Sequence, residues 1–211
     1  MPRLGFLFVL LVIAGSAQIC LAITGVPSLV LSEANIAYSG PGVPSLLVVP
    51  DGTGNPFTEA HDEAGAVVDA TITMVLRDPQ GHPITNFPLE DLWLESDDGG
   101  LVSCTWGPSP DNNTDVNGMT QWTQPALAGG HSQGPVFVLI NGSRMTSNEG
   151  VPLRFNSPDL NGDGIVHLTD VGFFSSDYYS GYNFRSDLNG DGQLNLSDVA
   201  LIARSYGAQC P

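Results

Sequence analysis

A six-residue sequence occurs twice near the C-terminus, at an offset of 28 residues. The two copies read Asp159-Leu160-Asn161-Gly162-Asp163-Gly164 and Asp187-Leu188-Asn189-Gly190-Asp191-Gly192. Each copy is followed by five residues and then a further acid, Asp170 or Asp198. Between residues 159–178 and 187–206, ten of twenty aligned positions are identical. Two copies in register indicate a repeated site rather than two ordinary turns.

The spacing of oxygen-bearing side chains predicts a calcium loop in each copy. Ca²⁺ takes six to eight oxygen ligands, and a 12-residue loop supplies side chains from positions 1, 3, 5 and 12 and a carbonyl from position 7. The predicted ligands are Asp159, Asn161, Asp163, Ile165 and Asp170 in the first loop, and Asp187, Asn189, Asp191, Gln193 and Asp198 in the second. Gly164 and Gly192 occupy position 6, where the chain turns sharply. These oxygen donors favour a hard cation over zinc, so we predict two Ca²⁺ sites.

Two positions depart from the commonest calcium loops. Position 12 is Asp rather than the longer Glu, and position 9 is His167 in the first loop and Asn195 in the second. A neutral imidazole is a poor calcium ligand, so we expect a water at this position and a weaker first site. A zinc role for His167 would need a Cys or a second His nearby, and the sequence has neither there.

A short helix is predicted after each loop, with Thr169 and Ser197 as candidate N-caps. Each helix carries one apolar stripe, made of Val171, Phe174 and Tyr178 in the first and Val199, Ile202 and Tyr206 in the second. We expect the two stripes to pack on each other. The incoming helix of a complete EF-hand is missing, because Ser157-Pro158 and Arg185-Ser186 directly precede the loops.

Residues 157–208, with their repeated loops and the sequence Leu196-Ser197-Asp198-Val199-Ala200, resemble a dockerin domain. The resemblance implies calcium binding by the ten residues above and docking onto a cohesin-like protein, often in assemblies that degrade polysaccharides. The partner-reading positions 10 and 11 would be Leu168-Thr169 and Leu196-Ser197, and Arg204 is the one basic residue of the two predicted helices. A segment this short has little core of its own. We therefore expect chelation to unfold it while the preceding region stays folded.

The region before the repeat has the pattern of an antiparallel β-sandwich. From Val67 to Asp78, apolar and polar residues alternate, which predicts a half-buried strand. Further strands are predicted at Leu92–Leu94, Leu101–Cys104, Met119–Thr123 and Val136–Ile140, with Gly, Asn and Asp turns between them. An Asp-x-x-Gly-x-Pro turn at residues 78–83 and a Thr-Asp-x-x-Gly turn at residues 114–118 resemble bacterial Ig-like domains of the invasin/intimin type. That resemblance implies an Ig-like fold and leaves the function open.

Residues 1–22 have the pattern of a secretory signal peptide: Arg3, an apolar run over residues 4–14, and Ala22 as the expected last residue, with Ala17 as the second choice. The apolar run is shorter than a membrane span. We therefore expect a secreted or extracellular-surface protein with no membrane span after cleavage. Cleavage leaves Cys104 and Cys210, which either form a disulfide or remain two buried thiols.

The composition excludes several classes of partner. The formal net charge is −16 and the pI is about 4.1, so nucleic acid and anionic membranes would be repelled. Residues 130–134 fit the Gly-x-Ser-x-Gly pattern of hydrolases, but Pro135 and a strand-like run follow instead of a helix. The acid pairs at residues 62–63 and 97–98 lie in predicted turns. We expect no enzymatic activity.

The sequence therefore predicts a mostly β chain with a small α module. Its parts are a signal peptide (1–22), an Ig-like β-sandwich (23–155), and a two-helix, two-calcium-loop dockerin-like domain (156–211) joined through residues 156–158. The first functional hypothesis is a secreted, non-catalytic protein that docks onto a cohesin-like partner. The second is an accessory or enzymatic component of extracellular polysaccharide degradation whose sandwich binds carbohydrate. Trp93, Trp106 and Trp122 are its candidate contacts if they are exposed in a planar row, and the alternative is that they pack in the core. The third is a surface or adhesion protein with purely structural calcium sites.

Overall fold

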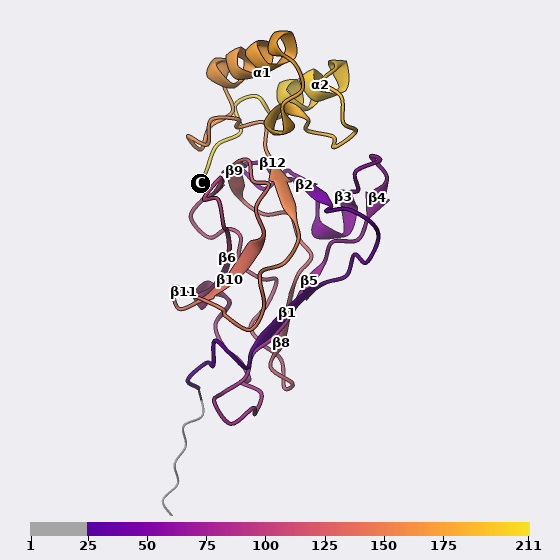
Figure 1. Cartoon of the computed structure of the whole chain (residues 1–211). Helices are drawn as coiled ribbons and strands as arrows, with labels where there is room; N and C mark the ends of the chain where they lie inside the picture. The colour runs from indigo at the N-terminus through magenta and orange to yellow at the C-terminus, as the bar shows by residue number, and fades with distance from the viewer. Residues whose placement is uncertain (1–24) are drawn as a thin grey trace, which may run out of the picture.

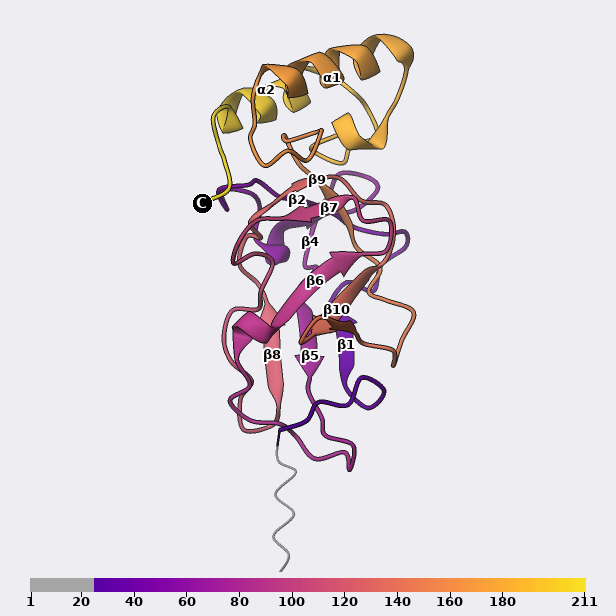
Figure 2. The ribbon, with the colours of Figure 1, turned by 90° about the vertical axis from the view of Figure 1, so that its left-hand side faces the viewer.

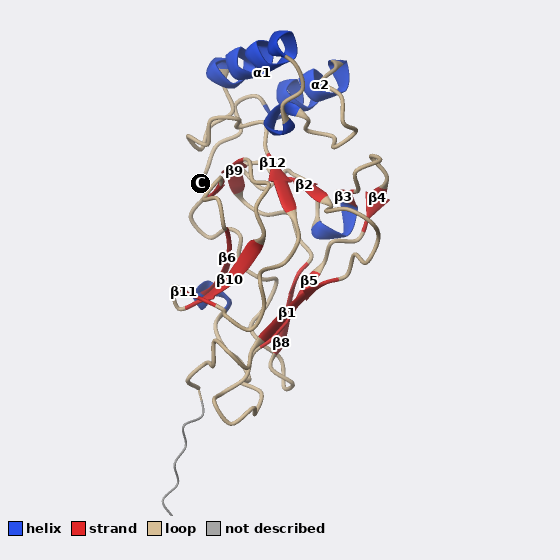
Figure 3. Cartoon of the chain, in the orientation of Figure 1, coloured by secondary structure: helices blue, strands red, loops and turns tan. Residues whose placement is uncertain are grey.

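The computed structural model describes residues 25–211, so the predicted signal peptide lies outside the described residues. The described chain is mostly β, with two α-helices near its C-terminus. Figures 1 and 3 show an elongated molecule with both helices at one end and the start of the described chain at the other. No helix within residues 25–211 has the length and apolar character needed to cross a membrane.

Two three-stranded antiparallel sheets form the main body. The first has the order β1-β5-β8, built from Glu33–Ile36, Ile72–Val75 and Met119–Trp122. The second has the order β11-β10-β6, built from Ser143–Arg144, Val136–Ile140 and Leu92–Ser96. In Figure 2, β6 lies in front of β5 and β8, and side chains from both sheets share one buried core. This arrangement is a β-sandwich.

Two smaller sheets close the end of the sandwich that faces the helices. One has the order β12-β2-β3-β4 and comprises Arg154–Asn156, Ser45–Leu47, Ala60–His61 and Val67–Val68. In it, β12 runs parallel to β2. The other pairs β7 (Leu101–Ser103) with β9 (Ala128–Gly130). Short 3-10 helices occupy Phe57–Glu59, Leu89–Asp91 and Phe184–Ser186.

The predicted strand from Val67 to Asp78 is confirmed in its buried face but not in its continuity. Ala70, Ile72, Met74 and Leu76 are all buried in the core. The chain leaves the sheet between β4 and β5, because the Asp69 carboxylate accepts a hydrogen bond from the Thr71 N–H at 2.8 Å. That local turn takes up the Thr71 N–H, whereas the Thr71 carbonyl oxygen still accepts from the Ala37 N–H at 2.9 Å. The other four predicted strands are present, and β6 continues two residues beyond its predicted end.

The helices α1 (Leu168–Ser180) and α2 (Leu196–Ser205) lie over the end of the sandwich (Figure 2). Beneath them is a second apolar core, which contains Phe174, Ile202, Leu160, Val166, Leu188 and Ala208 together with Leu47 and Val49 of the sandwich. The C-terminal module therefore completes its core with sandwich residues, a contact that the sequence pattern did not predict.

A disulfide joins Cys104, just after β7, to Cys210, 106 residues away, with a Cα–Cα distance of 5.3 Å. The first of the two alternatives for these cysteines is therefore the one observed. The bond ties the C-terminal tail to the sandwich.

Candidate metal centre

The two predicted calcium loops adopt the same hydrogen-bonding pattern. In the first loop, Asp159 accepts hydrogen bonds from the backbone N–H groups of Asp163 at 3.1 Å and Gly164 at 2.9 Å. In the second, Asp187 accepts from Asp191 at 3.1 Å and Gly192 at 2.9 Å. The carboxylate at position 1 therefore closes the turn around the glycine at position 6 in both loops.

The carboxylate at position 12 of each loop accepts hydrogen bonds from the backbone N–H groups of positions 9 and 3. Asp170 accepts from the N–H groups of His167 at 2.8 Å and Asn161 at 3.3 Å. Asp198 accepts from those of Asn195 at 2.8 Å and Asn189 at 3.4 Å. The position-12 carboxylate therefore lies against the backbone of position 3 in each loop.

Positions 5 and 7 lie on the outer side of each loop. Asp163 and Asp191 accept hydrogen bonds from Asn161 and Asn189 and from the N–H groups of the residues at position 7. Those position-7 residues, Ile165 and Gln193, have exposed side chains, so the group that they offer to a cation is the backbone carbonyl.

The carboxylates at positions 1 and 12 are buried in both loops. Burial raises the pKa of Asp159 and that of Asp198 above the ordinary value for Asp. Among the described residues, no ion pair joins Asp159, Asp187 or Asp198 to a basic side chain. Buried carboxylates are costly unless a cation or a proton compensates them, so the donor set fits a cation.

Each loop offers only a few acidic side chains as ligands for a cation. Within residues 25–211, no three or more His, Cys, Asp and Glu side chains are grouped in a way that could hold a metal ion by themselves. A cation in these loops would need the Asn at position 3 and backbone carbonyls as well, which is the usual mixture for calcium.

His167 lies between two acids of the first loop. Its Nδ1 is 3.0 Å from Asp170 and its Nε2 is 3.3 Å from Asp163. The hydrogen bond to Asp170 raises the pKa of His167. The second loop has Asn195 at this position, so the two loops differ in the group at position 9.

The predicted N-caps Thr169 and Ser197 are wrong. The caps are His167 and Asn195, two residues earlier, because the position-12 acid falls three residues into each helix and accepts the N–H of the cap. This is the reach-back half of a capping box. The same carboxylate thus ends the loop and starts the helix.

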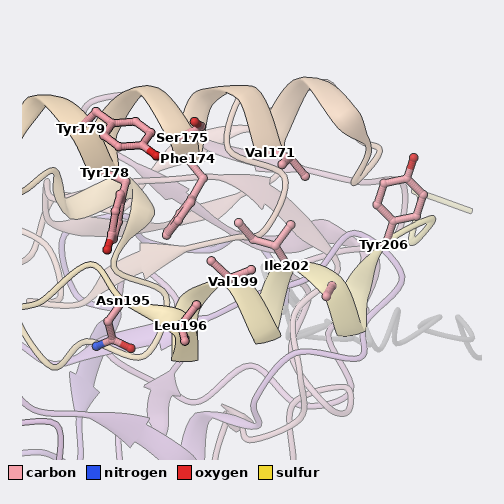
Figure 4. A pocket seen from close by; sticks show the side chains of 11 residues that line it. Val171, Phe174, Ser175, Tyr178, Tyr179, Asn195, Leu196, Val199, Ile202 and Tyr206 are labelled. Carbon is pink, nitrogen blue, oxygen red and sulfur yellow. The ribbon is translucent and has the colours of Figure 1, made fainter.

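The two apolar stripes face one another but leave a groove between α1 and α2 (Figure 4). Phe174 and Ile202 are buried at its floor, whereas Tyr178, Val199 and Tyr206 stay largely exposed along it. The groove has a volume of about 600 Å³ and a mostly apolar lining. The predicted packing of the stripes is therefore present only at the floor.

Several buried contacts between the loops and the sandwich had no signal in the sequence. Residues 156–158, predicted as a joint, are all buried, and Asn156 donates from its side chain to the carbonyl oxygens of Phe184 and Asp187. Within the C-terminal module itself, the exposed Tyr182 donates its hydroxyl to Asp187 at 2.9 Å. Partial burial, together with that hydrogen bond, raises the pKa of Tyr182 to about 12, so the hydroxyl keeps its proton.

Other candidate residues are placed less favourably for function. Trp122 is buried in the core, where its Nε1 donates to the Pro108 carbonyl oxygen at 2.9 Å, so it is not available to a carbohydrate. Trp106 is exposed and Trp93 is partly buried. Ser132, in the Gly-x-Ser-x-Gly segment, is fully buried, and residues 131–135 form no helix.

Comparison with known proteins gives little more. No family model matches the chain, and no curated protein matches it. Among solved structures it is similar to the Lin-41 filamin domain, with 16% sequence identity over 61% of this chain and 96% of that chain, at a TM-score of 0.28. A similarity at this level carries no conclusion about fold family or function.

Proposed function

We propose that this chain is a secreted, non-catalytic protein with an Ig-like sandwich and a dockerin-like C-terminal module. The module binds two Ca²⁺ ions and docks onto a cohesin-like partner. The observation that carries the calcium part is the matched pair of loops, in which buried carboxylates at positions 1 and 12 have the same hydrogen bonds in both copies. Three carboxylates in each loop repel one another without a cation, and Ca²⁺ would supply the charge that offsets them.

Calcium binding is tested by isothermal titration calorimetry of residues 23–211. We expect two equivalents of Ca²⁺ to bind, and Asp159→Asn or Asp187→Asn to remove one equivalent each. Asp115→Asn is the matched control, because Asp115 also closes a turn by accepting two backbone N–H groups, at 2.8 Å from both Asn117 and Met119. Its substitution should leave two sites. Absence of binding in the unsubstituted chain would contradict the proposal.

Docking is supported by the apolar surface beside the loops. Leu196, at position 10 of the second loop, is 83% exposed and Tyr179 is 85% exposed, and both line the groove between α1 and α2. Leu168, at position 10 of the first loop, is 73% exposed and is not part of the groove lining. Large apolar side chains grouped on one face of a soluble protein are typical of an interaction surface. Surface plasmon resonance against a panel of purified cohesin modules, with calcium and with chelator, tests this part; we expect calcium-dependent binding to at least one.

A second candidate is a surface protein in which the calcium sites only stabilise the fold. The core shared with Leu47 and Val49 and the disulfide to Cys104 favour it, because both fix the module to the sandwich. Calcium binding with no binding to any cohesin module would select this candidate over docking.

A further inference from the structure

The C-terminal tail pairs with the first calcium loop. Residues 207–210 run antiparallel to residues 164–166, with Ile165 opposite Gln209. Three backbone hydrogen bonds of 2.9 Å hold them together, from Val166 N–H to Ala208 O, from Gly207 N–H to Val166 O and from Cys210 N–H to Gly164 O. The paired segment covers positions 6 to 8 of the loop, which include the turn glycine and the residue whose carbonyl is a predicted ligand.

The second loop has no such pairing. Across the described chain, no backbone–backbone hydrogen bond from another segment reaches residues 192–194, the equivalent positions. The two loops, alike in their internal hydrogen bonds, therefore differ in how their outer half is held.

The disulfide anchors the paired tail to the sandwich at a point beside the first loop. Cys210 follows the last pairing residue and is bonded to Cys104. Its Sγ lies so close to Gly164 that a Cβ on that glycine would be 3.2 Å from the sulfur. The strand pair that leads to Cys104 also contacts the other side of the loop, because the Gly130 N–H donates to the Asp159 carbonyl oxygen at 2.9 Å. The first loop is thus held on both sides by one part of the sandwich.

We propose that the Cys104–Cys210 disulfide is a redox-sensitive clamp that raises the calcium affinity of the first loop and leaves that of the second unchanged. The proposal rests on the calcium function proposed above. With the bond closed, the tail keeps positions 6 to 8 in their turn. With the bond open, residues 207–210 can separate from residues 164–166. Only a fraction of the molecules then has the first loop in the conformation that binds calcium. The apparent dissociation constant rises in inverse proportion to that fraction.

The switching step is thiol–disulfide exchange with a dithiol reductant. One thiolate of the dithiol attacks Sγ of Cys210, the less buried of the two cysteines, and Cys104 leaves as a thiolate that takes up a proton. The second thiol of the reductant then displaces Cys210. The dithiol becomes a cyclic disulfide, and two electrons and two protons pass to the two cysteines. Oxidation in the secretory compartment is the reverse step and would switch on the first site.

The experiment is a calcium titration of the ¹⁵N-labelled chain, residues 23–211, followed by NMR at the amides of Gly164 and Gly192. These glycines are a matched pair, since each donates at 2.9 Å to the position-1 carboxylate of its own loop. The titration is run on the oxidised chain, on the chain reduced with a dithiol, and on Cys104→Ser/Cys210→Ser. We expect the midpoint at Gly164 to rise about tenfold in both open forms and that at Gly192 to stay within about twofold.

Equal midpoints at Gly164 in the open and closed forms would overturn the clamp while leaving calcium binding intact. An equal rise at both glycines would also overturn it, because it would indicate a general loss of stability. If neither glycine responds to calcium in the oxidised chain, the proposed function fails and the clamp fails with it. Should the serine variant fold poorly, the reduced chain gives the same comparison with every atom of the natural side chains present.

Discussion

The side-chain nitrogen of Asn156 donates a hydrogen bond to the carbonyl oxygen of Phe184 at 2.7 Å, across 28 residues of sequence. Asn156 ends the last strand of the sandwich, and Phe184 begins the short helix that leads into the second of the two predicted calcium loops. The same amide accepts from the Ser45 hydroxyl at 2.9 Å. One buried side chain therefore connects β2, β12 and the C-terminal module.

Asn156→Ala is expected to destabilise the chain by about 2–4 kcal/mol, because it leaves more than one buried polar group without a partner. Urea unfolding at saturating calcium measures the loss. Asn55→Ala is the control: the Asn55 side chain makes one hydrogen bond in an exposed setting, to the Glu59 carbonyl oxygen, and its loss should cost under about 1 kcal/mol. Equal losses in the two variants would contradict the role assigned to Asn156.

Calcium removal is expected to loosen the end of the sandwich as well as the module. The sequence alone suggested that chelation would leave the sandwich unaffected, but Leu47 and Val49 pack in the core of the module. A site held at about a hundred times its dissociation constant adds about 2.7 kcal/mol of stability. Hydrogen exchange measured by mass spectrometry should therefore accelerate in residues 45–49 on chelation, while residues 136–140 in β10 keep their protection. Unchanged exchange in residues 45–49 would show that the shared core does not couple the two parts.

The disulfide should contribute several kcal/mol to overall stability, separately from its effect on the first loop. It closes a loop of 106 residues, and the chain-entropy model assigns about 4.7 kcal/mol to a loop of about that length. Cys104→Ala/Cys210→Ala should lower the free energy of unfolding by about 2–5 kcal/mol in chelator, where calcium plays no part. An unchanged urea midpoint would rule this out.

Asp177 and Arg185 make stability depend on acid pH. Arg185 donates to Asp177 from Nε at 2.7 Å and from Nη2 at 2.9 Å, and this contact holds the pKa of Asp177 below its ordinary value of 3.8. A lowered folded-state pKa stabilises the fold at pH values above the ordinary one, and the contribution is lost as pH falls through the folded-state value. Urea midpoints from pH 6 to pH 2 should fall less steeply in Asp177→Asn, which should also cost about 2–3 kcal/mol at pH 6. The exposed Glu149→Gln is the control and should keep the slope of the unsubstituted chain.

Leu196→Ser should separate docking from folding. The side chain is 83% exposed, so its loss should change stability by under about 0.5 kcal/mol and leave both calcium sites intact. If the groove is the docking surface, binding to a cohesin module should weaken at least about tenfold, which is the effect of a central interface residue. Val116→Ser removes a similarly exposed apolar side chain from the turn before β8 and should have no effect on binding. Identical affinities for both variants would place docking elsewhere.

The sequence by itself determined the features whose parts lie close together in the chain. The spacing within the two predicted calcium loops, the helix after each loop and the alternating pattern of the strand from Ala70 to Leu76 are all local features, although the core that buries this strand comes from segments far away in the sequence. Over such distances the backbone geometry leaves few arrangements, so periodicity and turn residues are sufficient. Even here the helix caps lie two residues before the predicted ones, because the Asp at position 12 accepts the backbone N–H of His167 or Asn195 and so fixes the start of the helix there.

Only the tertiary structure decided how the module sits on the sandwich. The core around Leu47 and Val49, the amide of Asn156, the burial of Trp122 and the pairing of the tail with the first loop join segments that are far apart in sequence. No local pattern encodes such contacts, because each depends on the path of the whole chain between its two ends. The cysteine count allowed a bond between Cys104 and Cys210, but the fold had to bring their Cα atoms to 5.3 Å.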